Sequence, residues 1–382
     1  MRILVIGLFD SVHFARWLSQ FANSNCKIWI FPSKKFRHPH PDLISLLGGK
    51  ESNIICPELD SKFCIRFYGY IDFMFLKIGY RFKSYSRSSR LTRVLSAQNF
   101  DIIHAIEIQG AGYLLDSVSK EISKDVKSIV TNYGSDIAFF EHDLEHQLKI
   151  RSLLSWIQYY SAECKRDYTL ATKHGFKGIF LPCIPNAGGF SMELLESQKI
   201  LASERDLILV KSIGGTFGLG GVAVQAVSEF INSHSEFKVF FYAVTPDLLH
   251  EIKELKKRFP GRVDFSLRSK GLSRPDLLEK FSKARVYIGC SASDGISTSF
   301  LEAIVQGAYP IQTNTSCAGE WVDKGFAAST PNPSASEILT ELKRTLSPNF
   351  VNAAQEKNMK LATEHLAYEP LQATAKSFYY LN

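Results

Sequence analysis

The sequence contains no hydrophobic run long enough to cross a membrane, because its most apolar stretch, residues 67–78, is interrupted by Asp72 and Lys77. It also lacks a disulfide framework: the seven cysteines are scattered, odd in number and without a Cys-x-x-Cys pair, so we expect reduced, cytosolic thiols. His142 and His146 lie four residues apart without a third ligand, and we expect them on a charged surface helix. These absences exclude a polytopic membrane protein and argue against a metal centre.

The 382 residues have instead the composition of a soluble globular protein, with 45% hydrophobic and 22% charged residues. This composition excludes wholesale disorder, and the length predicts two domains at about 150 residues per domain. The N-terminal residues 1–7 form an apolar run that is too short for a signal peptide and has no small-residue cleavage site. We expect them to form a buried first strand.

Short apolar, β-branched runs alternate along the chain with amphipathic stretches such as 222–232 and 246–258. Continuous apolar runs are typical of parallel strands that are covered on both faces. Repeated strand–helix units of this kind predict an α/β protein with doubly wound sheets. The expected strands span 3–6, 27–31, 102–105, 128–131 and 178–181 in the first half, and 207–210, 238–242, 263–265, 286–290 and 309–312 in the second.

Two such series, on either side of Pro185 and Asn186, predict two Rossmann-like domains. The stretch 184–189 has the turn chemistry of a hinge. We expect an N-terminal domain of residues 1–185 and a C-terminal domain of residues 186–364. A C-terminal helix of about 365–382 is expected to pack back on the first domain. Two facing sheets of this type would place a ligand cleft between their carboxyl ends.

The excess positive charge is concentrated in residues 61–100, where eight cations and one carboxylate give +7, the net charge of the whole chain. Aromatic residues are interleaved with the cations. This pattern favours an anionic membrane surface or an anionic acceptor, and a solvated, partly buried helix pair is the structural alternative. No recognisable nucleic-acid module accompanies the charge. The eight cations are Lys62, Arg66, Lys77, Arg81, Lys83, Arg87, Arg90 and Arg93.

The stretch 284–325 carries the most informative chemistry. A strand leads into a polar loop with Asp294 and Gly295, and a helix of about 298–306 follows. Gly295 lets the backbone turn tightly and approach a ligand. A helix that starts here directs free amide groups and its positive dipole end at the ligand, which suits a diphosphate. Asp294 and Glu302 would flank that ligand, and such carboxylates need hydroxyl donors like those of a nucleotide-sugar.

Asp294 and Glu302 are separated by seven residues, and the whole block resembles the E-x7-E region of retaining GT-B glycosyltransferases of family 4, the glycosyl transferases group 1. The first acid is Asp rather than the usual Glu. The resemblance implies a GT-B architecture, two Rossmann-like domains facing each other across a cleft. The residues that carry the resemblance are Asp294-Gly295, Leu301-Glu302-Ala303-Ile304, Gly307, Pro310-Ile311 and Gly319-Glu320-Trp321-Val322.

By this resemblance, Asp294 contacts hydroxyls of the donor sugar and Glu302 accepts from the nucleotide ribose. Gly295, Ile296 and Ser297 hold the diphosphate. The family usually places an Arg and a Lys on the donor phosphates after the first strand of its C-terminal domain. This chain offers there one cation, Lys211, and a glycine-rich loop whose amides, at Gly214 and Gly215, would replace part of the missing charge. A strand-end surface lysine is the alternative for Lys211.

The resemblance extends to the N-terminal half. Residues 7–17 occupy the family's first strand–helix loop, and we expect His13 there to contact ligand and to belong with Asp294 and Lys211 to the catalytic group. Residues 131–136 match a Thr-x-His-Gly-x-Asp turn, with Tyr133 at the usual His. His104 lies within a buried strand pattern and is expected to be a core histidine. By topology, the expected acceptor-side residues are Glu107, Asn132 and Asp136.

These features predict a retaining, metal-independent glycosyltransferase without a cofactor. It would move a hexose from a nucleotide diphospho-sugar to a hydroxyl of a saccharide or lipid-linked saccharide, in surface polysaccharide or glycoconjugate synthesis. We expect a cytoplasmic protein that associates peripherally with the inner face of the membrane through residues 61–100 and does not bind nucleic acid. Two alternatives stay open: a sugar-nucleotide epimerase or phosphorylase, and a non-catalytic nucleotide-sugar-binding partner subunit.

Overall fold

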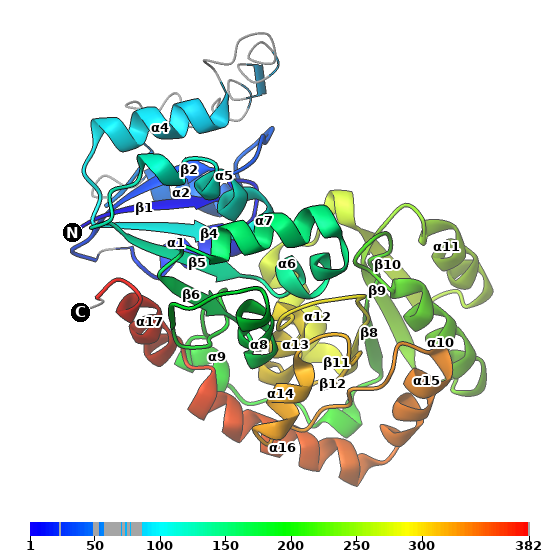
Figure 1. Ribbon diagram of the computed structural model, residues 1–382. Helices are drawn as coiled ribbons and strands as arrows, with labels where there is room; N and C mark the ends of the chain where they lie inside the picture. The colour runs from blue at the N-terminus through cyan, green and yellow to red at the C-terminus, as the bar shows by residue number, and fades with distance from the viewer. Residues whose placement is uncertain are drawn as a thin grey trace. The chain divides into compact units, whose positions relative to one another are not determined.

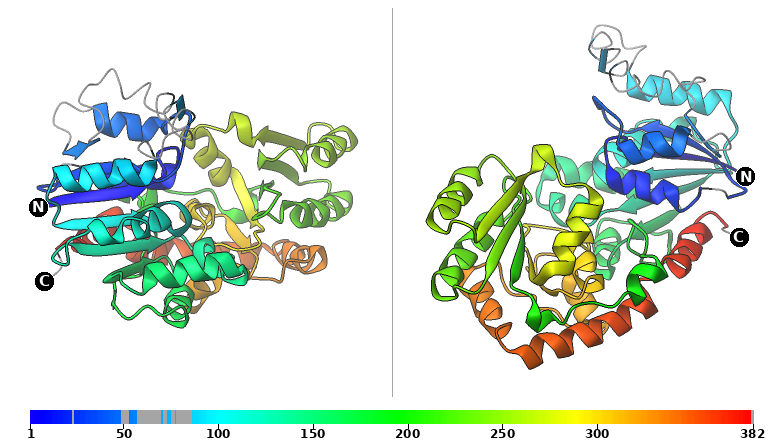
Figure 2. Two further views of the ribbon diagram at one scale, coloured as in Figure 1. Left: turned by 45° about the horizontal axis from the view of Figure 1, so that its top comes forward. Right: turned by 180° about the vertical axis from the view of Figure 1, so that it is seen from behind.

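The computed structural model describes residues 1–22, 24–48, 53–56, 70, 73, 74, 77 and 86–380. Most of the basic segment 61–100 therefore lies outside the described residues. The chain divides into two compact units: unit 1 comprises residues 1–188 and 369–382, and unit 2 comprises residues 189–368. Each unit is built on one parallel sheet with helices on both faces (Figures 1 and 2).

Unit 1 has a seven-stranded sheet in the order β3-β2-β1-β4-β5-β6-β7. Alternate residues of β1 face opposite sides: Ile3 and Val5 pack in the core with α1, α2 and α17, whereas Leu4 and Ile6 pack with α4, α5 and α7. Burial on both faces explains the continuous apolar runs of the sequence. The strands are β1 (Arg2–Gly7), β2 (Lys27–Pro32), β3 (Ile54–Ile55), β4 (Ile102–Ile106), β5 (Lys127–Asn132), β6 (Tyr159–Ala162) and β7 (Ile179–Phe180).

The last helix of the chain belongs to unit 1 through a buried tyrosine. Tyr379 accepts a hydrogen bond from Trp17 Nε1 at 3.2 Å and lies 2.9 Å from His104 Nδ1. His104 Nε2 lies 2.6 Å from the Thr131 hydroxyl, so both ring nitrogens have partners. Burial lowers the pKa of His104 to about 3. The expected core histidine is thus confirmed. The helices of unit 1 are α1 (Val12–Ser19), α2 (Pro41–Gly48), α4 (Arg87–Ala97), α5 (Tyr113–Asp116), α6 (Ser135–Ala138), α7 (Leu144–Leu154), α8 (Lys165–Lys173) and α17 (Tyr368–Ser377).

Unit 2 has a five-stranded sheet in the order β10-β9-β8-β11-β12. Val210 and Phe241 face α10, α11 and α15, whereas Leu209, Phe240 and Tyr287 face α12, α13 and α16. The strands are β8 (Leu207–Lys211), β9 (Lys238–Val244), β10 (Val263–Leu267), β11 (Ala284–Gly289) and β12 (Tyr309–Gln312). The helices are α9 (Met192–Glu196), α10 (Gly220–Ser233), α11 (Leu249–Arg258), α12 (Arg274–Lys283), α13 (Thr298–Val305), α14 (Ala318–Asp323), α15 (Ala335–Arg344) and α16 (Pro348–His365).

Each sheet has one point at which the strand order reverses. In unit 1 this point lies between β1 and β4, and in unit 2 between β8 and β11. Ligands of open parallel sheets bind at the carboxyl ends of the strands that flank such a point. We call the loops at the carboxyl ends of the strands the unit 1 edge and the unit 2 edge, and each edge includes the switch point of its sheet.

All ten strands expected from the sequence are present, within one or two residues at most ends. The sequence analysis missed β3 and β6. The residues of β6, Tyr-Tyr-Ser-Ala, are too short and too mixed to stand out, although all four are buried. His142 and His146 do not share a helix face: α7 begins at Leu144, and the ring of His146 contacts that of Tyr113. No helix among the described residues is long and apolar enough to cross a membrane.

Candidate functional site

The unit 2 edge consists of two loops that bond to each other. One follows β8 and the other follows β11. The amide of Ala292 donates to the carbonyl of Phe217 at 2.9 Å, and the amide of Leu219 donates to the carbonyl of Cys290 at 3.2 Å. Gly218 keeps the loop after β8 tightly folded, since a side chain there would collide with the carbonyl of Ile213 in the same loop. The loop that holds Asp294 and Gly295 is thereby tied to the loop that follows Lys211.

The loop after β11 ends at the N-terminus of α13. Ser297 occupies the position that caps this helix, yet its hydroxyl accepts no capping bond. The residue is 3% exposed, and its buried hydroxyl lies against that of Tyr287, whose pKa it lowers by hydrogen bonding. Gly295 and Ile296 are buried beside it, whereas Asp294 is half-buried. A helix start without a side-chain cap is suited to bind an anionic oxygen.

Two buried tyrosines support the start of α13 from behind. Tyr242, near the end of β9, donates to the hydroxyl of Ser299 at 2.8 Å. Tyr287 on β11 lies 3.5 Å from the amide oxygen of Gln312. Burial raises the pKa of both phenols, so they remain neutral donors. The sequence analysis predicted no role at the site for Tyr242 and Tyr287, because each lies in an apolar strand like an ordinary core aromatic.

Glu302 lies further along α13 and is 4% exposed. Its Oε1 accepts from Arg274 Nη1 at 2.9 Å. Burial raises the pKa of Glu302, and the charges of Arg274 and then Lys211 oppose that rise. Arg274 begins α12 and was not expected from the sequence, because it is 28 residues away from Glu302 in the chain. Two cations therefore act on the Glu302 carboxylate, Arg274 on α12 and Lys211 at the end of β8.

The glycine-rich loop after β8 does not offer the amides that we expected of it. The amide of Gly214 already donates to the Thr245 hydroxyl at 2.9 Å. Asp247 accepts hydrogen bonds from the Thr245 hydroxyl and from backbone amides, including that of Gly215, and these bonds lower its pKa. Gly215 has a φ of 75°, which explains the glycine at this position. A phosphate contact through these two amides would require the loop to rearrange.

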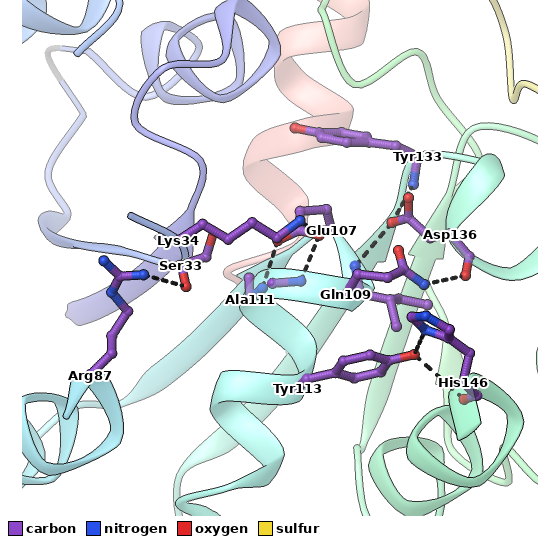
Figure 3. A network of polar contacts seen from close by, with 12 residues as sticks. Ser33, Lys34, Arg87, Glu107, Gln109, Ala111, Tyr113, Tyr133, Asp136 and His146 are labelled. Carbon is purple, nitrogen blue, oxygen red and sulfur yellow. Dashed lines mark hydrogen bonds and ion pairs between the residues drawn. The ribbon is translucent and has the colours of Figure 1, made fainter. Parts of the chain in front are cut away.

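The unit 1 edge is organised around Glu107, which follows β4 (Figure 3). Glu107 has a φ of 74° and a ψ of 145°, a conformation that is costly for any residue except glycine. Its carboxylate accepts from the amides of Gly110 at 2.8 Å and Ala111 at 2.7 Å, and so closes a single π-turn, η2 (Ile108–Gly112). Lys34, after β2, places its ammonium 3.7 Å from the same carboxylate.

Asp136 and Asn132 hold the neighbouring turn after β5. Asp136 accepts from the amides of Ile108 at 3.0 Å and Tyr133 at 3.2 Å. Burial, and next the charge of Glu107, raise the pKa of Asp136 to about 7. Asn132 is fully buried, and its side-chain oxygen accepts from the amide of Gly134 at 2.8 Å. Asp136 thus uses one carboxylate oxygen, and Asn132 its amide oxygen, to shape these loops, and their contact with an acceptor stays a prediction.

His13 lies in the first turn of α1, exposed, with its ring 5.9 Å from that of Tyr133. The unit 1 edge thus brings together His13, Glu107 and Asp136 from three different strand ends. The structure adds Lys34, Gln109 and the Tyr113–His146 pair, whose hydroxyl and Nδ1 lie 2.9 Å apart. These contacts join residues that are far apart in the chain, so no local sequence motif predicted that Lys34, Gln109 and the Tyr113–His146 pair belong to this edge.

Comparisons with known proteins bear on the family and the fold. Residues 49–168 match the sequence model of the family described as Glycosyl transferase 4-like. No curated protein sequence matches the chain. Among solved structures, a sucrose-phosphate synthase from Thermosynechococcus elongatus is similar over 99% of this chain and 98% of its own, with 10% identity and a TM-score of 0.69.

Two further structures are similar over the whole chain. HepE from Anabaena, solved in complex with UDP-glucose, covers 100% of both chains at 12% identity and a TM-score of 0.68. A glycosyltransferase from Rickettsia africae covers 99% of this chain and 97% of its own at 13% identity and a TM-score of 0.65. Residues 49–168 are therefore similar in sequence to the glycosyl transferase 4-like family, and the whole chain has the two-domain α/β GT-B fold that its motifs led us to expect.

Proposed function

We propose that the protein is a glycosyltransferase that moves a sugar from a nucleotide diphospho-sugar to the hydroxyl of a saccharide or lipid-linked saccharide. One observation carries this proposal: the amide donors at the N-terminus of α13 have no side-chain cap, and they lie at the switch point of the unit 2 sheet. A diphosphate would accept from these donors. The solved complex of HepE with UDP-glucose supports the same class of donor.

In this proposal Glu302 accepts from the ribose. Arg274 uses one carboxylate oxygen, at 2.9 Å, and also holds the carboxylate in place. Asp294, on the loop before α13, would accept from hydroxyls of the donor sugar. In addition to Lys211, the half-exposed Arg274 supplies a second cation, which the sequence analysis did not identify.

The chemical step requires stabilisation of the negative charge that develops on the leaving diphosphate. Fixed dipoles and charges aimed at that position accomplish this without reorganisation. We assign this role to the helix start and Lys211, and we propose that no metal ion or cofactor is needed. We propose retention at the anomeric carbon, with attack on the face from which the diphosphate departs, so that a phosphate oxygen takes the proton of the acceptor hydroxyl.

We assign the acceptor to the unit 1 edge, with His13 and Glu107 as the residues nearest to it. We further propose a cytoplasmic enzyme of surface polysaccharide or glycoconjugate synthesis that associates peripherally with an anionic membrane. The supporting observation is the charge of +7 in residues 61–100. Replacing Lys77, Arg87, Arg90 and Arg93 by glutamine should release the protein from anionic vesicles and leave donor binding unchanged, and retention on the vesicles would contradict this assignment.

Thermal unfolding in the presence of a panel of nucleotides and nucleotide-sugars tests the donor site. A matching nucleotide-sugar at about 100 times its Kd adds about 2.7 kcal/mol to the free energy of unfolding, which raises the Tm measurably. Glu302→Gln should lose most of this rise. The matched control is Glu279→Gln, which removes an exposed carboxylate from α12 and should retain the rise.

An unchanged Tm with every nucleotide-sugar, or an equal rise in Glu302→Gln, would contradict the donor assignment. Release of nucleoside diphosphate on addition of acceptor distinguishes transfer from the alternatives. Interconversion of the free nucleotide-sugar without acceptor would identify an epimerase. Binding without turnover across saccharide acceptors would identify a non-catalytic partner subunit.

A further inference from the structure

The end of β2 in unit 1 carries a group of cations that the donor chemistry does not use. Lys34 and Lys35 follow the strand and are exposed, and Arg37 lies just beyond them. Arg87, the first residue of α4, donates from Nη1 to the carbonyl of Ser33 at 3.3 Å. This bond joins the helix start to the strand end, so charges from two elements gather at one place (Figure 3).

The charge pattern of α4 is unfavourable for the helix itself. Arg87 and Arg90 lie in its first four residues, and its first turn contains no acidic residue. Cations at a helix N-terminus oppose the helix dipole, which favours anions there. An anion bound at this end would remove that conflict and would also meet the charge of Lys34.

Ser33 supplies an independent sign of a ligand. It is 5% exposed, and its hydroxyl oxygen is buried without a hydrogen-bond partner. A buried hydroxyl without a hydrogen-bond partner costs free energy. In folded proteins such groups usually bind a water molecule or a ligand. In Figure 3 Ser33 lies beside Lys34, while its carbonyl accepts from Arg87.

Lys34 is placed to exchange its present partner for an anion. Its stem packs over Gly110, where a side chain would collide with it, and its side chain is 50% exposed. The ion pair with Glu107 is loose at 3.7 Å. Glu107 keeps its two amide donors whichever way Lys34 turns, so the movement would leave no buried carboxylate without partners.

We infer that Ser33, Lys34 and Arg87 bind a phosphate or diphosphate group. Phosphate oxygens accept from ammonium, guanidinium and hydroxyl groups alike, which matches this set of donors. The assignment of this group to the acceptor, as a sugar phosphate or a lipid-linked diphosphate saccharide, rests on the proposed function. The anion site itself does not.

The rate at which individual lysines of the full chain are acetylated, measured by mass spectrometry of the peptides, tests whether an anion binds at Lys34. Inorganic pyrophosphate is titrated at constant ionic strength during a brief pulse of acetic anhydride. We expect pyrophosphate to slow the acetylation of Lys34 several-fold and to leave exposed Lys124 of the same unit unchanged. Equal rates at Lys34 with and without pyrophosphate, or equal slowing of both lysines, would overturn the inference.

Two variants separate binding from folding. Arg87→Gln should raise the pyrophosphate concentration needed for protection about tenfold, because the variant loses one charge-assisted hydrogen bond to the ligand. Ser33→Ala should also weaken protection, while its Tm stays the same or rises, because an unpaired buried hydroxyl has been removed. A Ser33→Ala variant with lower Tm and undiminished protection would show that the hydroxyl has a structural role only, and would remove Ser33 from the site.

Vesicles distinguish the two sources of the phosphate. Protection of Lys34 by phosphatidylcholine vesicles that contain phosphatidic acid, and not by phosphatidylcholine alone, assigns a membrane-borne group. Protection by soluble pyrophosphate but not by the vesicles assigns a soluble phosphorylated acceptor. Neither readout involves the donor, so failure of nucleotide-sugar binding at Glu302 would refute the proposed function and leave the anion site standing.

Discussion

The buried carboxylates of the two units are held in different ways. In unit 1, Glu107 and Asp136 each accept from two backbone amides, and these bonds shape the loops after β4 and β5. In unit 2, Glu302 sits on a regular helix and is held by one side chain, that of Arg274. Glu107 follows β4 and Glu302 lies on the helix after β11, and these two strands flank the switch points of the two sheets, where ligands are expected.

The difference shows how a polar residue at such an edge can serve the fold or a ligand. A carboxylate that receives backbone amides stabilises its own loop, and substituting it should chiefly change stability. A carboxylate held by one flexible cation on a helix retains capacity for a ligand, and substituting it should chiefly change binding. The variants below are ordered by the size of the effect that this distinction predicts.

Arg274→Ala should have the largest effect. It leaves the Glu302 carboxylate buried without its hydrogen-bonded partner, which we expect to lower the free energy of unfolding by about 3 kcal/mol at neutral pH. The double variant Arg274→Ala/Glu302→Gln removes the buried charge and should recover part of that loss. Chemical denaturation of both variants measures the difference. A double variant less stable than the single one would contradict the assigned ion pair.

Glu107→Ala should lower the free energy of unfolding by about 2.5 kcal/mol, because the amides of Gly110 and Ala111 lose a charged acceptor. Glu107→Gly should be less harmful by about 1 kcal/mol, since glycine adopts the positive φ without strain. Glu145→Ala, at an exposed position of α7, is the control and should change stability by less than about 0.5 kcal/mol. Equal losses in the Ala and Gly variants would show that the backbone at Glu107 is not strained.

The pH dependence of unit 1 should reveal His104. Its folded pKa of about 3 lies below its ordinary value of 6.5, so the unfolded chain binds the proton first and stability is lost as the pH falls below 6.5. At pH 5 the loss reaches about 2 kcal/mol. Asp136 acts in the opposite direction, because its raised pKa of about 7 favours the protonated folded form as the pH falls.

Comparison with a His104→Gln variant separates these two contributions. The wild-type protein should lose about 2 kcal/mol more than His104→Gln between pH 7 and pH 5, measured by chemical denaturation. The same pH dependence in both proteins would mean that His104 titrates normally and is not buried as described.

Ser297→Ala should weaken donor binding about tenfold and change the Tm little, because the hydroxyl makes no capping bond to α13. Ser299→Ala is the contrasting variant: it leaves the buried Tyr242 hydroxyl without an acceptor and should lower stability by about 1 kcal/mol. Calorimetric titration with the nucleotide-sugar and thermal unfolding separate the two effects. A lower Tm in Ser297→Ala with full donor affinity would refute the ligand role of Ser297.

Sequence reasoning worked best where function is local in the chain. Residues 294–302 form one loop and one helix, so the sequence pattern predicted that Asp294 and Gly295 lie on the loop and Glu302 on the helix, while their roles came from the family resemblance. It failed where partners come from distant elements: Arg274 reaches Glu302 from another helix, and Lys34 reaches Glu107 from another strand end. It also overestimated Gly214 and Gly215, whose amides are engaged by the loop after β9, a contact that no pattern in the sequence encodes.

The location of the donor site is tested most directly by hydrogen–deuterium exchange with and without UDP-glucose, the ligand solved with HepE. The amides at the start of α13, from 295 to 300, should exchange more slowly with the ligand present, whereas those of α11, on the opposite face of the same sheet, should not change. Protection confined to residues outside 295–302, with α13 exchanging as in the free protein, would place the nucleotide-sugar elsewhere and contradict the assigned donor site.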